Sequence, residues 1–390
     1  MSDKSAIEWT DATWTPIRAR NRKTGKVGWY CEHATPGCVN CYAESFNARL
    51  GTGLPFKPGH RDDVELLLDE KMLLAPLRWK RPRMVFVCSM TDLFADFVPD
   101  AWIDRIFAVM ALAPQHTFQV LTKRAERMRT YLSDRLRGSF VTAAALAMTP
   151  GRDWEKTPAW NMPWPLPNVW LGVSAEDQRR ADERIPHLLA TSAAVRFISA
   201  EPLLGPIDLT RVGTLDSVCA AMPGVVEREN RGRPVSGPGS ICGVQIDAIG
   251  AAASSITFFQ TPDHMGGFTA ASPRSWPCLD WVVVGGESGR GARTMHPQWA
   301  RSLRDQCEDA GVAFFFKQWG ECVPAELIAG DKRDEPWRRP QNGAGEAWSF
   351  TEYGAPRETW PQVRFWRVGK KAAGRLLDGV EYNGMPEARP

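Results

Sequence analysis

Short apolar runs recur along the chain, and each has the composition of a buried strand. The runs are rich in Val, Phe, Ile, Leu and Trp and are short, which favours strands buried on both faces. They cover residues 84–89, 117–122, 169–174, 195–200, 279–286 and 312–317. A further strand is expected within "IEWTDATWTPI", residues 7–17.

Stretches with helical periodicity lie between several of these runs. They are residues 102–113, 180–190 and 297–311. The last stretch has Pro297 at its start and Gly311 at its end, the usual punctuation of a helix. Strands that alternate with helices predict a parallel sheet, either open or closed into a barrel.

Polar residues follow each predicted strand. In a parallel α/β fold the carboxyl ends of the strands point the same way, toward the face where such enzymes keep their active sites. A polar turn explains any single group equally well, but the recurrence of Asp, Glu, Lys and Ser indicates an active-site face. The groups are Ser89, Thr91 and Asp92; Thr122, Lys123 and Arg124; Ser174 and Glu176; Glu201; Glu287; and Lys317.

Three of the nine cysteines fall in one loop, which reads "WYCEHATPGCVNCYAE". Cys31, Cys38 and Cys41 have the spacing C-x6-C-x2-C, and the last two can reach one metal centre. One alternative is a zinc ion, with His33 completing a Cys3His set. Another is an iron–sulfur cluster held by three cysteines, which leaves one iron open for a ligand. Three incidental thiols are the remaining explanation. A helix is expected next, over about residues 42–50.

Composition narrows the class of protein. The chain has 390 residues, of which 43% are hydrophobic and 24% charged, as in ordinary soluble globular proteins. The formal charge of +3 neither identifies nor opposes a nucleic-acid binder. The odd number of unevenly spaced cysteines argues against a disulfide scaffold. "MSDKSAIEWTDATW" lacks an apolar signal region, and no apolar run reaches the ~18 residues of a membrane span. We therefore expect a cytoplasmic protein that does not enter a membrane.

The cysteine loop resembles that of the radical S-adenosylmethionine superfamily, whose usual spacing is C-x3-C-x2-C. "CSMTDLFADFVPD", residues 88–100, and "VLTKRAERM", residues 120–128, resemble stretches of its spore photoproduct lyase-like branch. "IEWTDATW", "PGCVNCYAE", "VVVGGESGRGAR" and "FFFKQWG" are similar to a family of phage-encoded three-Cys-motif proteins, which is uncharacterised and radical-SAM-like. The resemblance covers residues 7–209 and 279–321.

This resemblance implies a partial (β/α) TIM-type barrel of about six parallel strands, with an insertion and a C-terminal extension. Residues 1–209 would form the first part of the barrel, with the cluster loop at residues 31–41. Residues 210–278 would be the insertion, residues 279–323 the last barrel strands, and residues 324–390 the extension.

The implied cofactors are a [4Fe–4S] cluster and S-adenosylmethionine. The thiolates of Cys31, Cys38 and Cys41 would hold the cluster, whose fourth iron would bind the amino and carboxylate groups of S-adenosylmethionine. An electron from a donor such as flavodoxin or ferredoxin would cleave the sulfonium into methionine and a 5′-deoxyadenosyl radical, which abstracts a hydrogen atom from the substrate. The cofactor carries this chemistry, and the protein binds and orients it.

The resemblance also assigns roles to strand-end residues. Ser89, Thr91 and Asp92 would lie where members of the superfamily contact the cofactor's amino group. Ser174 and Glu176 would contact its ribose or its carboxylate. Three further candidates are Glu201 for a ribose hydroxyl or substrate amine, Tyr42 for the adenine, and Cys88 as a hydrogen-atom donor. Plain packing is the alternative for the tyrosine, and a structural buried thiol for Cys88.

Basic residues near the strand ends are candidates for binding an anionic substrate. "GGESGRGAR", residues 285–293, has the glycines and arginines of a phosphate-binding turn, although an ordinary glycine-rich turn fits as well. The substrate candidates are Lys123, Arg124, Glu287, Arg290 and Lys317, with Arg293 nearby.

We expect a radical S-adenosylmethionine enzyme that modifies or repairs a nucleic-acid base, DNA or RNA. The second hypothesis is the same chemistry on a small molecule or a protein partner. The third is a non-enzymatic nucleic-acid-binding protein stabilised by zinc or a cluster. Carboxylates at the strand ends favour an enzyme, because a simple phosphate binder gains nothing from acidic groups. If the chain is phage-encoded, the compartment is the host cytoplasm.

Overall fold

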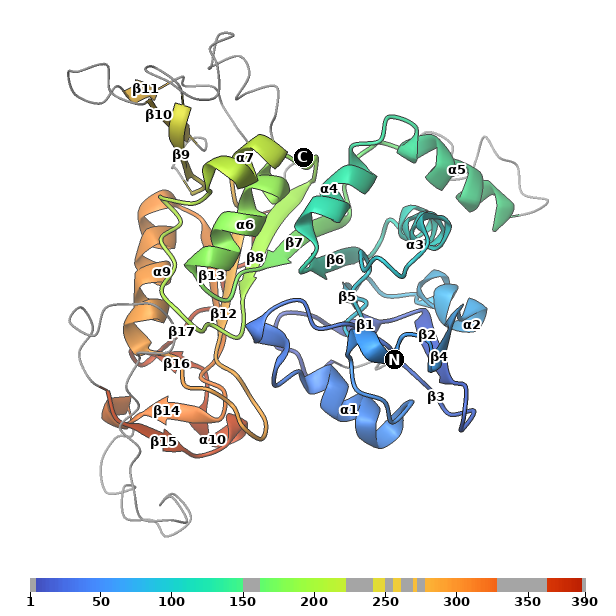
Figure 1. The fold of residues 1–390 in the computed structure, drawn as a ribbon, viewed down its shortest axis with the longest axis horizontal. Coiled ribbons are helices and arrows are strands. Elements are labelled where there is room, and N and C mark those ends of the chain that lie inside the picture. The colour runs from blue at the N-terminus through green and yellow to red at the C-terminus, as the bar shows by residue number, and fades with distance from the viewer. Residues whose placement is uncertain are drawn as a thin grey trace. The chain divides into compact units, whose positions relative to one another are not determined.

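The computed structural model describes residues 5–149, 162–221, 241–249, 255–260, 269–271, 278–327 and 363–387 (Figure 1). The fold divides into two compact units that interleave along the chain. The first unit comprises Met1–Val173, His187–Phe197 and Glu387–Pro390, and the second comprises Ser174–Pro186 and Ile198–Pro386.

The first unit is built on parallel strands that match the predicted apolar runs. These strands are β1 (Ala12–Trp14), β5 (Met84–Val87), β6 (Thr117–Thr122) and β7 (Val169–Ser174). Each pairs in parallel with the next, so that Trp14, Val87, Val120 and Leu171 form one row across the sheet. Helix α3 (Asp100–Leu112) connects β5 to β6, as the periodicity predicted.

A smaller antiparallel sheet in the same unit was not predicted. It has the order β3–β2–β4, with β2 (Ile17–Asn21), β3 (Val27–Gly28) and β4 (Val64–Leu68). The stretch expected to form one strand therefore contributes to two sheets, because β1 ends at Trp14 and β2 begins three residues later. The helices of this unit also include α1 (Tyr42–Leu50), α2 (Glu70–Leu73), α4 (Ala125–Leu132) and α5 (Arg137–Ala147).

The remaining predicted strands are β8 (Val195–Ala200), β12 (Trp281–Gly285) and β13 (Ala313–Gln318). They complete a seven-stranded sheet in the order β1–β5–β6–β7–β8–β12–β13. The predicted α/β class with parallel strands is confirmed, and the expected count of about six strands is corrected to seven because β1 joins the sheet. β1 and β13 are the edges of this sheet among the described strands, so it is open rather than a closed barrel.

Two predicted helices connect these strands. Helix α6 (Gln178–Leu189) lies between β7 and β8, and helix α9 (Pro297–Ala310) lies between β12 and β13. The His296 ring accepts a hydrogen bond from the Gln298 backbone N–H at the start of α9, and Gly311 ends the helix with φ +66°. The predicted punctuation of this helix is confirmed.

The segments predicted as an insertion and an extension carry small elements of their own. The insertion contains α7 (Leu215–Ala221) and a sheet in the order β11–β10–β9. Its strands are β9 (Ile241–Asp247), β10 (Ser255–Gln260) and β11 (Thr269–Ala271). Near the carboxyl end lie β14 (Cys322–Pro324), β15 (Phe365–Arg367), α10 (Lys370–Ala373), β16 (Leu376–Leu377) and β17 (Val380–Glu381). Short 3-10 turns are η2 (Pro58–His60), η3 (Pro76–Arg78) and η5 (Ala325–Leu327).

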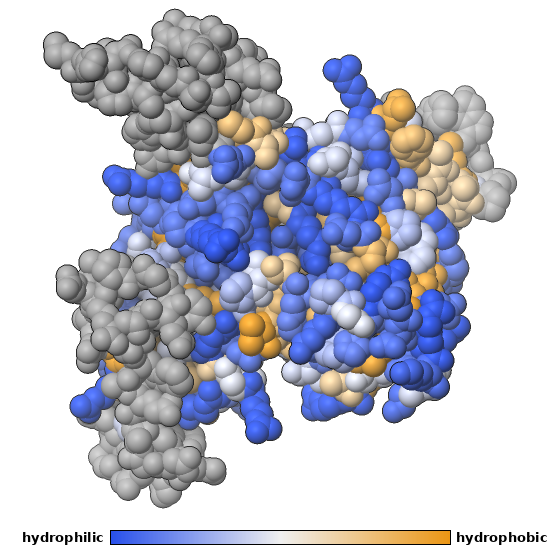
Figure 2. Space-filling view, viewed as in Figure 1, coloured by the Kyte–Doolittle hydropathy of each residue, from blue (hydrophilic) through white to orange (hydrophobic). Residues whose placement is uncertain are grey.

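The surface seen in Figure 2 is largely polar, with apolar residues gathered over α5. Leu136 and Phe140 are 59% and 47% exposed there. Across the described ranges, no helix is both long enough and apolar enough to span a bilayer.

Close approach of two chain segments explains one glycine of the "GGESGRGAR" turn. The Gly286 backbone N–H donates to the Gln318 carbonyl at 2.9 Å, which brings the end of β12 against the end of β13. A Cβ at Gly286 would lie 1.9 Å from the Trp319 carbonyl oxygen. Glycine is required here by the backbone itself, whatever the turn binds.

Gly286→Ala is expected to lower the free energy of unfolding by roughly 1–3 kcal/mol, because the new methyl group forces the two backbones apart. Urea unfolding followed by circular dichroism measures the change. Gly59→Ala is the control, since an added Cβ there has nothing within 4 Å. Equal stability of the two variants would contradict the close approach.

Candidate cofactor site

The cysteine loop folds as consecutive turns that lead into α1. Pro36 and Gly37 form a tight turn, as part of the 3-10 helix η1 (Pro36–Cys38). The Cys38 N–H donates to the Thr35 carbonyl at 2.9 Å, and the Cys41 N–H donates to the Cys38 carbonyl at 3.2 Å. Cys41 then caps the start of α1. The predicted helix after the loop is confirmed.

The three thiols lie within electrostatic reach of one another. Burial, together with the charges of Asp92, Cys41 and Cys38, raises the pKa of Cys31 to about 12, although the Arg124 guanidinium opposes the rise. Burial also raises the pKa of Cys41, although the first backbone N–H groups of α1 oppose this. The loop alone therefore favours neutral thiols, and a bound cation would supply the charge that thiolates need.

Cysteine thiolates are donors that suit both a zinc ion and an iron–sulfur cluster. Over the described part of the chain, no group of three or more His, Cys, Asp or Glu side chains is arranged to hold one metal ion. A single zinc ion draws its thiolates together at Zn–S distances of about 2.3 Å. A four-iron cluster binds each thiolate through a different iron, so it accepts thiols that are more widely spaced.

His33, the fourth ligand in the zinc hypothesis, makes a contact that shapes the loop. Its Nε2 lies 2.5 Å from Glu44 Oε2, and its backbone N–H donates to the Phe56 carbonyl at 3.0 Å. The Phe56 N–H donates in turn to Glu44 Oε1 at 3.2 Å. These contacts fix the loop against α1 and leave only Nδ1 of His33 for a metal.

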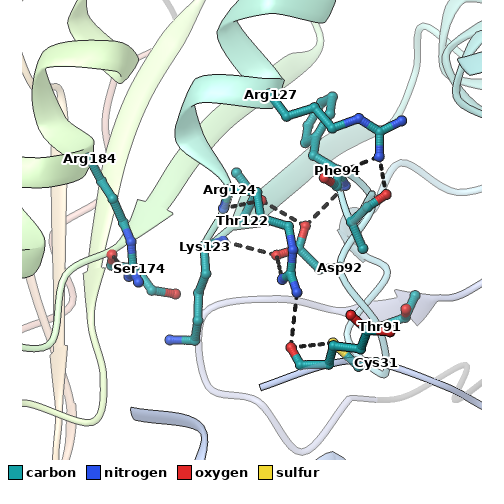
Figure 3. Close-up of polar contacts among 12 residues, drawn as sticks. Cys31, Thr91, Asp92, Phe94, Thr122, Lys123, Arg124, Arg127, Ser174 and Arg184 are labelled. Carbon is teal, nitrogen blue, oxygen red and sulfur yellow. Dashed lines mark hydrogen bonds and ion pairs between the residues drawn. The ribbon is translucent and has the colours of Figure 1, made fainter. Parts of the chain in front are cut away.

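Asp92 is the centre of a buried polar network (Figure 3). Its Oδ1 accepts hydrogen bonds from the Thr122 hydroxyl at 2.7 Å and the Phe94 N–H at 3.0 Å. Its Oδ2 accepts from the Lys123 N–H and the Arg124 guanidinium, both at 3.0 Å. A carboxylate has about four acceptor sites, and all are used. Asp92 therefore positions neighbouring groups in this structure, and its contact with a cofactor amine stays a prediction.

Arg124 joins this network to the cysteine loop. The same guanidinium donates to the Glu32 carbonyl at 2.9 Å, and the Cys31 thiol approaches that carbonyl at 3.8 Å. We call Asp92, Thr122 and Arg124 the Asp92 clamp. Arg124 thus connects Asp92 to the cysteine loop, and its contact with a substrate stays a prediction.

Other strand-end residues hold the two sides of the loop. The Thr91 hydroxyl donates to the Tyr30 carbonyl at 2.6 Å, next to Cys31. The Tyr42 hydroxyl donates to the Ser89 carbonyl at 2.6 Å, while the ring stays 52% exposed. The hydroxyl of Thr91 thus holds the loop, and the exposed ring of Tyr42 remains a candidate for the adenine.

Lys123 contacts Asp92 of the clamp through its backbone N–H. Figure 3 shows its side chain extending away from Asp92. Its ammonium lowers the pKa of Cys41, against the larger effect of burial. Lys123 therefore lies within electrostatic reach of the loop, where a cation stabilises thiolates.

Cys88 lies at the end of β5 in a strained conformation. Its φ of +56° is in the left-handed region, which is uncommon for a residue other than glycine. Burial raises its pKa well above the ordinary value, and Asp92 and Cys31 raise it further. Cys88 is thus a neutral thiol within electrostatic reach of the loop.

In the second unit, two predicted cofactor contacts are engaged by arginine. Glu176 is 1% exposed and forms a buried ion pair with Arg184 at 2.9 Å. The Arg184 guanidinium also donates to the Ser174 carbonyl at 2.6 Å. This pairing gives Glu176 a structural partner that the sequence did not indicate.

The glycine-rich turn uses its polar groups internally. Glu287 Oε2 accepts from the Arg293 backbone N–H at 2.8 Å and from its Nε at 2.9 Å. The Gly289 N–H donates to Glu321 Oε1 at 2.9 Å. These contacts favour the ordinary glycine-rich turn over the phosphate-binding turn, and Arg290 is exposed beside it.

The last two candidates pair with each other. Lys317 Nζ lies 2.6 and 2.9 Å from the two carboxylate oxygens of Glu201. Gln318, which was not among the candidate site residues, donates to the same carboxylate at 3.4 Å. Gln318 is the last residue of β13, and only the structure shows that its side chain points to Glu201.

The fold and site define a parallel α/β protein with a three-cysteine loop clamped by the residues after β5 and β6. Residues 4–386 match the model of a family described as "Protein of unknown function (DUF5131)", and the chain belongs to that family. Comparisons with curated proteins and with solved structures find no match.

Asp92→Asn is expected to destabilise the protein by roughly 2–4 kcal/mol, because Arg124 loses a buried partner. The freed loop should also let iodoacetamide label Cys31 several-fold faster in metal-free protein, measured by mass spectrometry. Glu65→Gln is the control, since the Arg20–Glu65 pair is about half exposed and contributes about 1 kcal/mol or less. Destabilisation without faster labelling would show that the clamp does not hold the loop.

Proposed function

We propose that the protein is a radical S-adenosylmethionine enzyme whose [4Fe–4S] cluster is held by Cys31, Cys38 and Cys41. The observation that carries this proposal is a set of three interacting thiols on one loop, clamped to the ends of parallel strands. When bound, the cofactors supply a 5′-deoxyadenosyl radical through one-electron cleavage of the sulfonium, with methionine as the other product.

The residues around the loop suit this task. Arg124 stands beside Cys31, and Lys123 and the first amides of α1 act on Cys41. The thiolates of Cys31 and Cys41 would thus each have positive charge nearby, which favours the charged form that binds iron. An external reductant such as flavodoxin or ferredoxin is the proposed electron donor.

Cys88 is the proposed hydrogen-atom donor. A donor must carry its S–H bond in the resting state, and burial keeps this thiol protonated. Its left-handed backbone aims the side chain from the end of β5, and such strain clusters at functional sites. For the cofactor's adenine we propose the exposed ring of Tyr42, with Ser89 next to it.

The proposed substrate is a base of DNA or RNA. Lys123 in the first unit and Arg290 in the second are basic residues, and each carries a charge that attracts phosphates. A small molecule or a protein partner is the alternative substrate. The zinc-stabilised binding protein is the remaining alternative, with Nδ1 of His33 as the fourth ligand.

Anaerobically purified protein is expected to contain about four irons per chain and to form 5′-deoxyadenosine when given S-adenosylmethionine and dithionite. Iron analysis and liquid chromatography measure the two quantities. Cys31→Ala should lose both, whereas Cys307→Ala should lose neither, because Cys307 is buried in α9. Stoichiometric zinc without iron would contradict the proposal.

Binding of a nucleic acid should weaken as salt rises, because phosphate contacts release counterions. We expect micromolar or weaker affinity for labelled single- or double-stranded DNA or RNA, given the small net charge. Fluorescence anisotropy at two salt concentrations measures it. Lys123→Met should reduce the salt dependence, and Lys23→Met, in the loop after β2, should not. An absence of binding to any nucleic acid at low salt would favour the small-molecule or protein substrate.

A further inference from the structure

Strand β13 ends in a bulge that points two neighbouring side chains toward the same carboxylate. Val284 pairs with Phe316, but the next residue, Gly285, pairs with Gln318, so Lys317 is an extra residue on β13. Neighbours on a regular strand point to opposite faces. Here Lys317 and Gln318 both contact the Glu201 carboxylate, at 2.6–2.9 Å and 3.4 Å. Bulges re-aim side chains in this way beside active sites.

The backbone around the bulge is fixed from two sides. The Arg375 Nε donates to the Lys317 carbonyl at 3.0 Å, and the Gly286 N–H donates to the Gln318 carbonyl at 2.9 Å. A Cβ at Gly285 would lie 3.3 Å from Glu201 Cδ, so glycine leaves room for that side chain. The three polar side chains are therefore held in one arrangement, which we call the Glu201 subsite (Glu201, Lys317 and Gln318).

This subsite has acceptor capacity that its own residues do not use. Gln318 is 2% exposed, and its Oε1 has no hydrogen-bond partner among the described residues. An unsatisfied buried acceptor is costly, and one in a native structure calls for a missing donor. The side chains of Glu201 and Lys317 are 19% and 11% exposed, so the ion pair is sheltered but reachable.

The chemistry of the subsite selects one kind of ligand edge. Glu201 offers two adjacent acceptors, and Lys317 offers a donor beside them. The Watson–Crick edge of guanine carries the complement, with two neighbouring N–H donors and a carbonyl acceptor. Adenine and cytosine place a donor beside an acceptor, and uracil has a single donor between two acceptors.

We propose that the Glu201 subsite binds the Watson–Crick edge of a guanine base. The guanine N1–H and one N2–H donate to Glu201, the other N2–H donates to the unpaired Oε1 of Gln318, and Lys317 keeps one carboxylate contact while it donates to O6. This inference rests on the proposed function for its choice of a nucleic-acid base, but binding at the subsite requires neither cluster nor S-adenosylmethionine. The same edge occurs on free guanine nucleotides and on unpaired guanines of a strand.

Calorimetric titration of the full-length protein with GMP, AMP, CMP and UMP tests the proposal. GMP should bind tighter than the other three by about tenfold or more, the discrimination of one bidentate base contact. Equal affinity for all four, or no binding of any, would overturn the proposal. If GMP binds, the same titration with a single-stranded oligonucleotide that has one guanine, and with its guanine-free counterpart, distinguishes free nucleotides from a strand. A site for a strand binds the guanine-containing oligonucleotide more tightly than GMP, and a site for free nucleotides does not.

A specificity change tests the role of Glu201 itself. Glu201→Gln replaces one acceptor by a donor, so GMP should lose about tenfold or more in affinity while AMP gains relative to GMP. Glu326→Gln is the matched control, because Glu326 pairs with Arg301 in the same unit and is 53% exposed. Retention of the guanine preference in Glu201→Gln would overturn the assignment.

The outcomes for the subsite and for the proposed function are separate. Nucleotide binding is measured on protein without cofactors, and 5′-deoxyadenosine formation on loaded protein. Formation of 5′-deoxyadenosine without a guanine preference would overturn only the subsite.

Discussion

The Asp92 carboxylate is the interaction on which the first unit's candidate site depends. It lies just after β5 and accepts hydrogen bonds from residues that lie at the end of β6 and just beyond it. Through Arg124 it also reaches the Glu32 carbonyl inside the cysteine loop. A buried carboxylate needs hydrogen-bond donors for its oxygens. Asp92 obtains them only when the segments after β5 and β6 are folded against each other. The loop is therefore positioned by the sheet as well as by its own turns and its contacts with α1.

Charge is the second constraint on the loop. The protein around the loop disfavours the thiolate forms of Cys31 and Cys41, because burial raises the pKa of both thiols and the Asp92 carboxylate raises that of Cys31 further. Arg124, Lys123 and the start of α1 offset part of this. The balance suits a protein that binds a positively charged centre and remains neutral in its absence. The same burial that raises the thiol pKa would shield a bound cluster from water.

The sequence predicted the elements whose signals are local. Apolar runs located β5, β6, β7, β8, β12 and β13, and Pro297 and Gly311 marked α9. The small sheet of β2, β3 and β4 was missed, because short strands with a mixed pattern such as "IRARN" carry a weak signal. The cysteine loop was found from its spacing, which is also a local property.

The roles of the polar residues depend on partners that are distant in the sequence. Asp92 and Arg124 lie 32 positions apart, and Glu201 and Lys317 lie 116 apart. Residue type and strand-end position showed that these side chains belong near a site. They could not show that Asp92 has all its acceptors filled, or that a bulge turns Lys317 and Gln318 toward one carboxylate. Those facts depend on register, which no single stretch of sequence encodes.

The central claim is that the clamped cysteine loop holds a four-iron cluster with one open iron. Electron paramagnetic resonance of the dithionite-reduced protein tests it most directly, with spectra recorded before and after addition of S-adenosylmethionine. The account predicts a reduced [4Fe–4S] signal whose g values shift when S-adenosylmethionine binds the open iron. A reduced cluster signal that S-adenosylmethionine leaves unchanged, or iron-free protein without a signal, would contradict it.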